Sequence, residues 1–182
     1  MQDIERRWFL SAVTAAFSGL ALPAGLRASA QTAGIKVAAG QDRFGKTRQI
    51  GVSSTTFKIA GADTAGGLFV MEQANSVNGG PPRHLHHEQD ELWYVLAGDY
   101  VVEIGSERHL LKPGDCILGP RRVPHGWAFI GDSPGRLLIA FTPAGKMQEN
   151  FERDRKSGEY RSDAEVFRAY GMELVGPPLA IK

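Results

Sequence analysis

The chain has 182 residues, of which 42% are hydrophobic and 23% are charged, a composition that suits a globular protein with an ordinary core. Its formal charge of +1 at pH 7 comes without a basic stripe or a long run of like charge. This excludes any charge-based argument for nucleic-acid binding and favours small-molecule or protein partners. A single cysteine, Cys116, excludes a disulfide within the chain, and its apolar neighbours predict a buried side chain.

The first thirty residues have the features of an export signal. Arg6 and Arg7 precede a mildly apolar stretch over 8–22, and the small residues "ASA" at 28–30 suit a signal peptidase. The sequence "RRWFL" resembles the twin-arginine export signal of bacteria, although two flanking residues depart from the usual pattern. We predict a cleavable signal over 1–30, a periplasmic or secreted protein, and no stable membrane span after cleavage. An uncleaved anchor and an ordinary secretory signal remain alternatives.

Residues 31–50, rich in glycine, alanine and polar residues, are predicted to form an N-terminal arm. Short β-type segments then alternate with turns rich in glycine, proline, asparagine and aspartate. The predicted strands lie at 54–60, 67–73, 91–97, 100–104, 108–112, 116–119, 125–130 and 136–142. This spacing predicts an antiparallel sandwich or barrel. Because no internal repeat is visible, we expect one barrel over 51–145.

The last part of the chain, 146–182, is predicted to be a helical segment. Ser162 and Glu165 have the spacing of a capping box, and Gly171 stands where the helix would end. A weaker helix candidate covers 146–156. Both helices are expected to pack on the barrel or on a second subunit, and a lid over the pocket is the alternative for the earlier one.

Three histidines and three acids lie within "HLHHEQDE" at 84–91. Side chains alternate along a strand, so His84 and His86 share one face while His87 points the other way. The polar residues that follow are predicted to form a solvated turn, after which Glu91 opens a new strand beside the two histidines. His87 is expected at the surface or in a supporting hydrogen bond.

His125 is the fourth member of the predicted site. It begins another strand after Pro124, whose missing N–H suits the entry of a strand. Three imidazoles and one carboxylate form a mixed nitrogen and oxygen site that suits divalent Fe, Mn, Ni or Co, and zinc less well. The predicted metal ligands are therefore His84, His86, Glu91 and His125. The alternative is a set of hydrogen-bonded polar residues at the mouth of a barrel, without an ion.

These residues carry a resemblance to the cupin superfamily over about Thr55 to Pro143. The segment "GGPPRHLHHEQDELWYVLAG" resembles the first cupin motif, and "GDCILGPRRVPHGWAF" resembles the second. The matched residues are Gly79, His84, His86, Glu91 and Gly98 in the first and Gly114, Pro120 and His125 in the second. Arg122 replaces a usual glycine and Phe129 a common asparagine. The resemblance implies an all-β fold, a single-domain cupin (jelly-roll) β-barrel with a short C-terminal helical tail.

Four further residues share a strand face with Glu91 or His125 and are predicted to line a substrate pocket. They are Trp93, Val95, Trp127 and Phe129. An apolar wall around a metal suits an aromatic or otherwise planar substrate. The same residues would equally form the packed core of a small barrel. Leu92, Tyr94 and Leu96 then point outward, and since cupins commonly dimerise, a homodimer is one expected cover for them.

Within the cupins, the chain looks most like the quercetin 2,3-dioxygenase-like group. The resemblance implies a divalent metal that binds a flavonol or related enol, which O2 then cleaves. Glu91 would be both a metal ligand and the general base that takes the hydroxyl proton of the substrate. The alternatives are a metal-dependent isomerase or decarboxylase of a small oxo-acid or sugar, and a binding protein without turnover.

Overall fold

The computed structural model describes residues 33–153 and 164–181. The predicted export signal over 1–30 and Ser162 of the predicted capping box lie outside these residues. Within the described part of the chain, no helix is long and apolar enough to cross a membrane.

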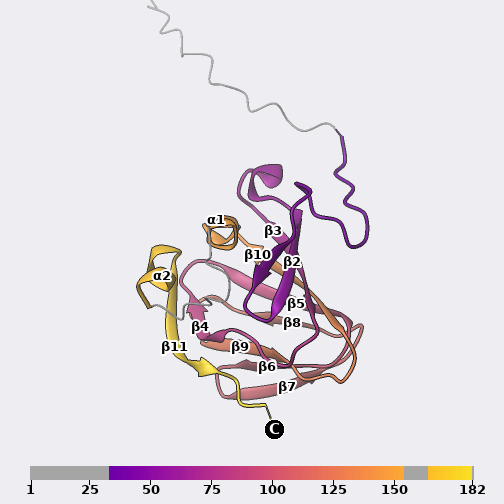
Figure 1. The fold of residues 1–182 in the computed structure, drawn as a ribbon. Helices are drawn as coiled ribbons and strands as arrows, with labels where there is room; N and C mark the ends of the chain where they lie inside the picture. The colour runs from indigo at the N-terminus through magenta and orange to yellow at the C-terminus, as the bar shows by residue number, and fades with distance from the viewer. Residues whose placement is uncertain (1–32, 154–163, 182) are drawn as a thin grey trace, which may run out of the picture. The chain divides into compact units, whose positions relative to one another are not determined.

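The described residues form two antiparallel sheets, which face each other and enclose the core (Figure 1). The six-stranded sheet has the order β1 (Arg48–Ile50), β2 (Ser53–Ile59), β3 (Phe69–Asn75), β10 (Gly135–Thr142), β5 (Asp90–Ala97) and β8 (Cys116–Gly119). The five-stranded sheet has the order β11 (Met172–Pro178), β4 (Pro82–His86), β9 (His125–Phe129), β6 (Tyr100–Ile104) and β7 (Glu107–Leu111). The predicted all-β jelly-roll barrel is thereby confirmed.

Three short helical segments accompany the sheets in the described part of the chain. A 3-10 helix, η1, covers Gly61–Thr64, and the helices α1 and α2 cover Met147–Glu152 and Ala164–Ala169. Both α-helices lie at one end of the barrel (Figure 1). Each contributes buried side chains, Met147 from α1 and Phe167 from α2, to the core cluster.

Along β5, side chains alternate between the buried face and the exposed face, as the sequence predicts. Trp93 and Val95 of β5 are fully buried, whereas Tyr94 and Leu96, which follow them in turn, are exposed. The homodimer remains a prediction, and these outward side chains belong to the surface that it would cover. Cys116 is exposed on the edge strand β8, opposite Tyr94, so the prediction of a buried cysteine is wrong. The two residues pair in register and therefore share the outer face.

Strand β4 depends on the end of the described chain for most of its pairing. It meets β9 at a single pair, His84 opposite His125, but pairs with β11 through four residue pairs. The predicted helical segment over 146–182 does contain α1 and α2, but its residues 172–178 form this strand instead. That part of the prediction is wrong because the strand pairs with β4, which is distant in sequence.

Replacing Gly80 by alanine is expected to lower the free energy of unfolding by about 3 kcal/mol. A Cβ at this position would overlap the backbone carbonyl of Trp127, which cannot move without disturbing β9. Urea unfolding measures the change. Gly34→Ala is the control, because no atom of the described residues, apart from Gly34 and its two chain neighbours, lies within 4 Å of its Cβ position. Equal unfolding midpoints for the two variants would contradict the expected overlap.

Candidate metal centre

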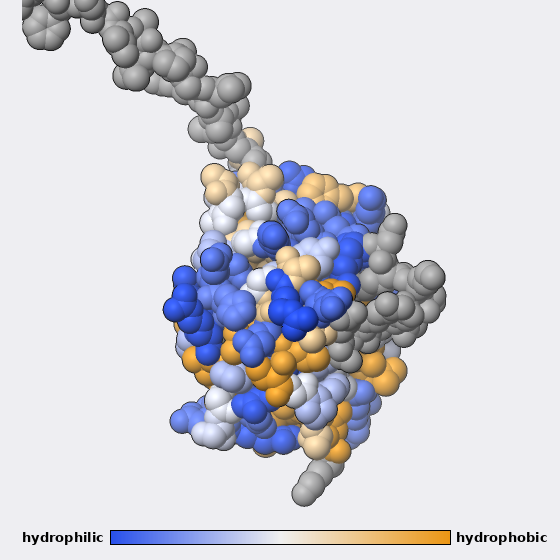
Figure 2. Space-filling model, turned by 90° about the vertical axis from the view of Figure 1, so that its left-hand side faces the viewer, coloured by the Kyte–Doolittle hydropathy of each residue, from blue (hydrophilic) through white to orange (hydrophobic). Residues whose placement is uncertain are grey.

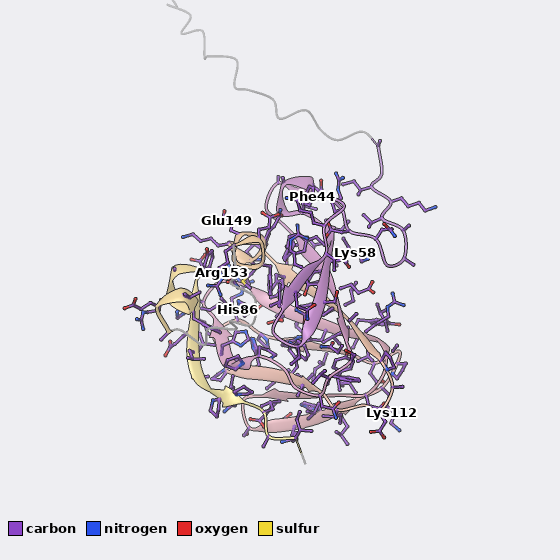
Figure 3. The ribbon with its side chains drawn as sticks, in the orientation of Figure 1. Phe44, Lys58, His86, Lys112, Glu149 and Arg153 are labelled. Carbon is purple, nitrogen blue, oxygen red and sulfur yellow. The ribbon has the colours of Figure 1, made fainter. Side chains whose placement is uncertain are left out.

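The four predicted ligands come together inside the barrel. His84 and His86 project inward from β4, Glu91 from β5 and His125 from β9. Their exposed fractions are only 6%, 0%, 3% and 0%, respectively. Figure 3 shows His86 inside the barrel, toward the end where α1 and α2 lie. One donor atom from each of the four residues lies within 4.8 Å of every other.

The distances between donors suit a shared metal ion. Oε2 of Glu91 lies 3.1 Å from Nε2 of His86 and 3.2 Å from Nε2 of His125. An ion about 2.1 Å from each donor would hold opposite donors about 4.2 Å apart, close to the spread of this group. The buried imidazoles and carboxylate are therefore able to bind a metal ion, with the nitrogen and oxygen ligands that a divalent transition metal accepts.

One hydrogen bond fixes the orientation of His84. Its Nδ1 lies 2.8 Å from the carbonyl oxygen of Pro82, to which it can only donate. This leaves the lone pair on Nε2 free for a metal. In His86 and His125, Nδ1 is buried without a hydrogen-bond partner among the described residues, while Nε2 faces Glu91.

Burial sets the charge of the site. Desolvation, with help from the imidazoles of His86 and His125, lowers the pKa of His84 to about 3. Burial also acts to raise the pKa of Glu91, but hydrogen bonds and charge interactions with His125 and His86 outweigh it and lower that pKa well below its usual range. At neutral pH the site therefore offers a carboxylate and a neutral His84, which are the ligating forms of both residues.

Arg122 adopts the backbone conformation that a glycine would favour. Its φ is +65°, in the left-handed region, at the position where the second cupin motif usually has glycine. Its backbone N–H donates to the carbonyl of His86 at 2.7 Å, and its Nε donates to the carbonyl of His87 at 3.2 Å. The turn before His125 is thus bound directly to the end of β4.

The connection between β4 and β5 is only partly the solvated turn that was predicted. His87 and Glu88 are exposed, as expected. Asp90 forms an ion pair with Arg121 at 2.8 Å, and this partner lowers the pKa of Asp90 to about 2. Gln89 is buried, which the sequence analysis did not anticipate.

A cavity of about 270 Å³ opens beside the metal ligands. His84, His86 and Glu91 form part of its wall. Most of the remaining lining is apolar, including Met71, Ile139, Phe141, Met147, Phe151 and Phe167. Figure 2 shows the side of the molecule on which α1 and α2 lie, where apolar side chains are gathered among charged ones.

Of the four predicted pocket residues, only Trp127 lines this cavity. The prediction is wrong for Trp93, Val95 and Phe129, which belong to the packed core, the alternative that the sequence left open. Trp93 packs its ring against His125 with centroids 5.2 Å apart, and Phe129 packs against Tyr100 at 5.3 Å. Core residues and cavity residues both point into the barrel. Trp93, Val95 and Phe129 lie in the part of the barrel that side chains fill completely.

Strands β3 and β10 supply a wall of the cavity that was not predicted from the sequence. Met71 and Gln73 of β3 share an inward face, as do Ile139 and Phe141 of β10. Gln73 was detectable as a polar residue on the same strand face as Phe69 and Met71, two positions beyond Met71. Arg153, which follows α1, was also missed.

Residues 74–141 match the family model described as the cupin domain. The pectin degradation protein KdgF of Dickeya dadantii is 34% identical over 61 residues, which cover 33% of this chain and 54% of that protein. Germin-like protein 2-4 of Oryza sativa is 31% identical over 96 residues, covering 50% and 42%. The matched segments thus span about half the length of these curated relatives.

Two solved structures share the fold. KdgF from a Halomonas species superposes with a TM-score of 0.52 at 18% identity, covering 62% of this chain and 94% of that one. An RmlC-like cupin from Shewanella frigidimarina gives 0.50 at 19% identity, covering 63% and 94%. The chain therefore has the fold of these structures, matches the cupin domain over residues 74–141, and carries a buried group of three histidines and one glutamate.

Proposed function

We propose that this protein is an exported, metal-dependent cupin enzyme that binds a small enol, such as a flavonol, and promotes its reaction with O2. The observation that carries the proposal is the position of Glu91. It belongs to the buried ligand group and also lines the apolar cavity. A substrate in that cavity would meet a metal and an ionised carboxylate at the same place.

The residues of the chain supply a basic group and a dry environment. The carboxylate of Glu91 is buried beside the cavity, and in the proposed reaction it accepts the proton of a substrate hydroxyl. The apolar side chains around it exclude water and strengthen electrostatic interactions in the cavity. A bound divalent metal would act as a Lewis acid toward the substrate oxygen.

The size and lining of the cavity favour a compact planar substrate. Its volume of about 270 Å³ lies just below the range of about 300–1,000 Å³ common for ligand pockets. Phe141, Phe151 and Trp127 provide aromatic walls. A flavonol or a smaller enol fits this description.

A second candidate is metal-dependent isomerisation or decarboxylation of a small oxo-acid or sugar. The similarity to a protein named for pectin degradation favours this chemistry, which would use the same ligands without O2. A metal- or small-molecule-binding protein without turnover is the remaining alternative.

Oxygen uptake separates these functions. We expect the purified protein to contain one divalent metal per chain by elemental analysis, and to consume O2 when supplied with a panel of flavonols and enols. Removal of the metal with a chelator should abolish the uptake. Anaerobic turnover of oxo-acids or sugars would support the isomerase or decarboxylase instead. Stoichiometric metal with no turnover under either condition would leave a binding protein.

A further inference from the structure

Arg153 brings a positive charge to the lining of the cavity. Among the described lining residues, Arg153 is the only charged side chain apart from the metal-binding group. Its Nε donates to the carbonyl of Asn150 at 3.3 Å, and its guanidinium lies over the ring of Tyr170, 5.8 Å from the centroid. No carboxylate of the described residues lies within ion-pair distance of it. Figure 3 shows Arg153 between α1 and His86.

The charge of the cavity favours an anionic ligand. A divalent metal would outweigh the single negative charge of Glu91, and Arg153 adds a further positive charge. The apolar walls keep the local dielectric constant low, so this excess of positive charge is poorly screened. A ligand that brings a negative charge would balance it.

Gln73 supplies a second recognition group. Its side chain lines the cavity, yet the residue is only 4% exposed. Its Oε1 accepts no hydrogen bond from any described residue. A buried amide oxygen without a donor is unfavourable, and a donor group on a bound molecule would satisfy it.

Ser53 offers the complementary donor on the same wall. Tyr100 donates from its hydroxyl to Oδ1 of Asn75 at 2.9 Å, and Nδ2 of Asn75 donates to Oγ of Ser53 at 2.7 Å. Because Ser53 accepts in this bond, its own hydroxyl hydrogen is left to donate into the cavity that it lines. The wall formed by β2 and β3 therefore presents a donor and an acceptor.

We propose that the cavity selects a small organic acid whose anionic group pairs with Arg153. A hydroxyl of the same molecule donates to Oε1 of Gln73, or an oxo group accepts from the hydroxyl of Ser53. This deepens the proposed function, on which it rests, by naming the substrate class as an acidic enol or a hydroxy- or oxo-carboxylate. Arg153 and Gln73 are then the residues that determine specificity.

Calorimetric titration of the metal-loaded protein with salicylate and salicylamide tests the proposal. The two compounds share a ring and a hydroxyl and differ in the acid group. We expect the protein to bind salicylate at least about tenfold more tightly, as a charge-assisted hydrogen bond implies. Arg153→Gln should reduce this preference to about twofold or less, and Arg153→Lys should keep part of it. Gln73→Leu should weaken both compounds by about fivefold to tenfold.

Arg108→Gln is the matched control, because Arg108 lies on β7, which contributes no described residue to the cavity. Thermal unfolding checks that each variant is folded. The proposal is overturned if the wild type binds neither compound or binds both equally. It is also overturned if Arg153→Gln keeps the preference, or if Arg108→Gln loses it.

Binding and turnover separate this inference from the proposed function. Selective binding of salicylate without O2 uptake or anaerobic turnover on any substrate would support the acid-selective cavity and overturn the enzyme. Rapid O2 uptake with neutral flavonols, without a preference for salicylate, would support the enzyme and overturn the acid-selective cavity.

Discussion

Glu91→Gln is expected to lower turnover by about 10²–10⁴-fold while most of the metal stays bound. Glutamine keeps the size of the side chain and an oxygen that can bind an ion, but it cannot accept a proton at neutral pH. The loss should equal the contribution of a general base, which is typically of this size. Steady-state turnover and elemental analysis of the same sample measure the two effects.

Glu88→Gln is the control for this variant. Glu88 is an acid of the same eight-residue cluster but lies exposed in the connection between β4 and β5, so its removal should change neither turnover nor metal content. Full turnover in Glu91→Gln would remove the role of general base. If metal and turnover were lost together, Glu91 would be assigned the role of a metal ligand alone and not that of a general base.

His86→Ala is expected to weaken metal binding by more than about 100-fold. Even partners that merely orient a ligand are worth about 10–100-fold in affinity, and His86 supplies a donor directly. Its ring is fully buried and lies 5.4 Å from the rings of His125 and Phe141, so no solvent water replaces it freely. Elemental analysis after dialysis should find much less than one metal ion per chain.

Thermal unfolding provides a second measurement for His86→Ala. A metal at 100 times its dissociation constant stabilises the native state by about 2.7 kcal/mol, so a chelator should lower the Tm of the wild type. The Tm of His86→Ala should be the same with and without chelator. His87→Ala, which removes an exposed histidine from the same cluster, should behave like the wild type. A full complement of metal in His86→Ala would contradict the assignment of the site.

The four candidate metal ligands could be predicted because their positions follow from strand alternation and from a short turn, both of which are local in sequence. Alternation on β4 selects His84 and His86, and a turn returns Glu91 beside them. The cavity was harder, because Trp93 and Met71 both point inward and only the packing of the whole barrel separates core from cavity.

Long-range pairing explains the other differences between sequence and structure. The segment "MELVGPP" contains a glycine and two prolines, which are poor strand signals, and its strand conformation comes from β4. The exposure of Cys116 follows from its register with Tyr94, which no property of the segment "CILG" specifies.

The pairing of β4 with β11 also sets the order of events during synthesis. A ribosome makes the last residue of the metal group, His125, well before it makes Met172–Pro178. Until those residues emerge, the strand that carries two of the ligands has only its single pair with β9 to hold it. A metal bound by this group would therefore gain the support of the β4–β11 pairing only once β11 has been translated.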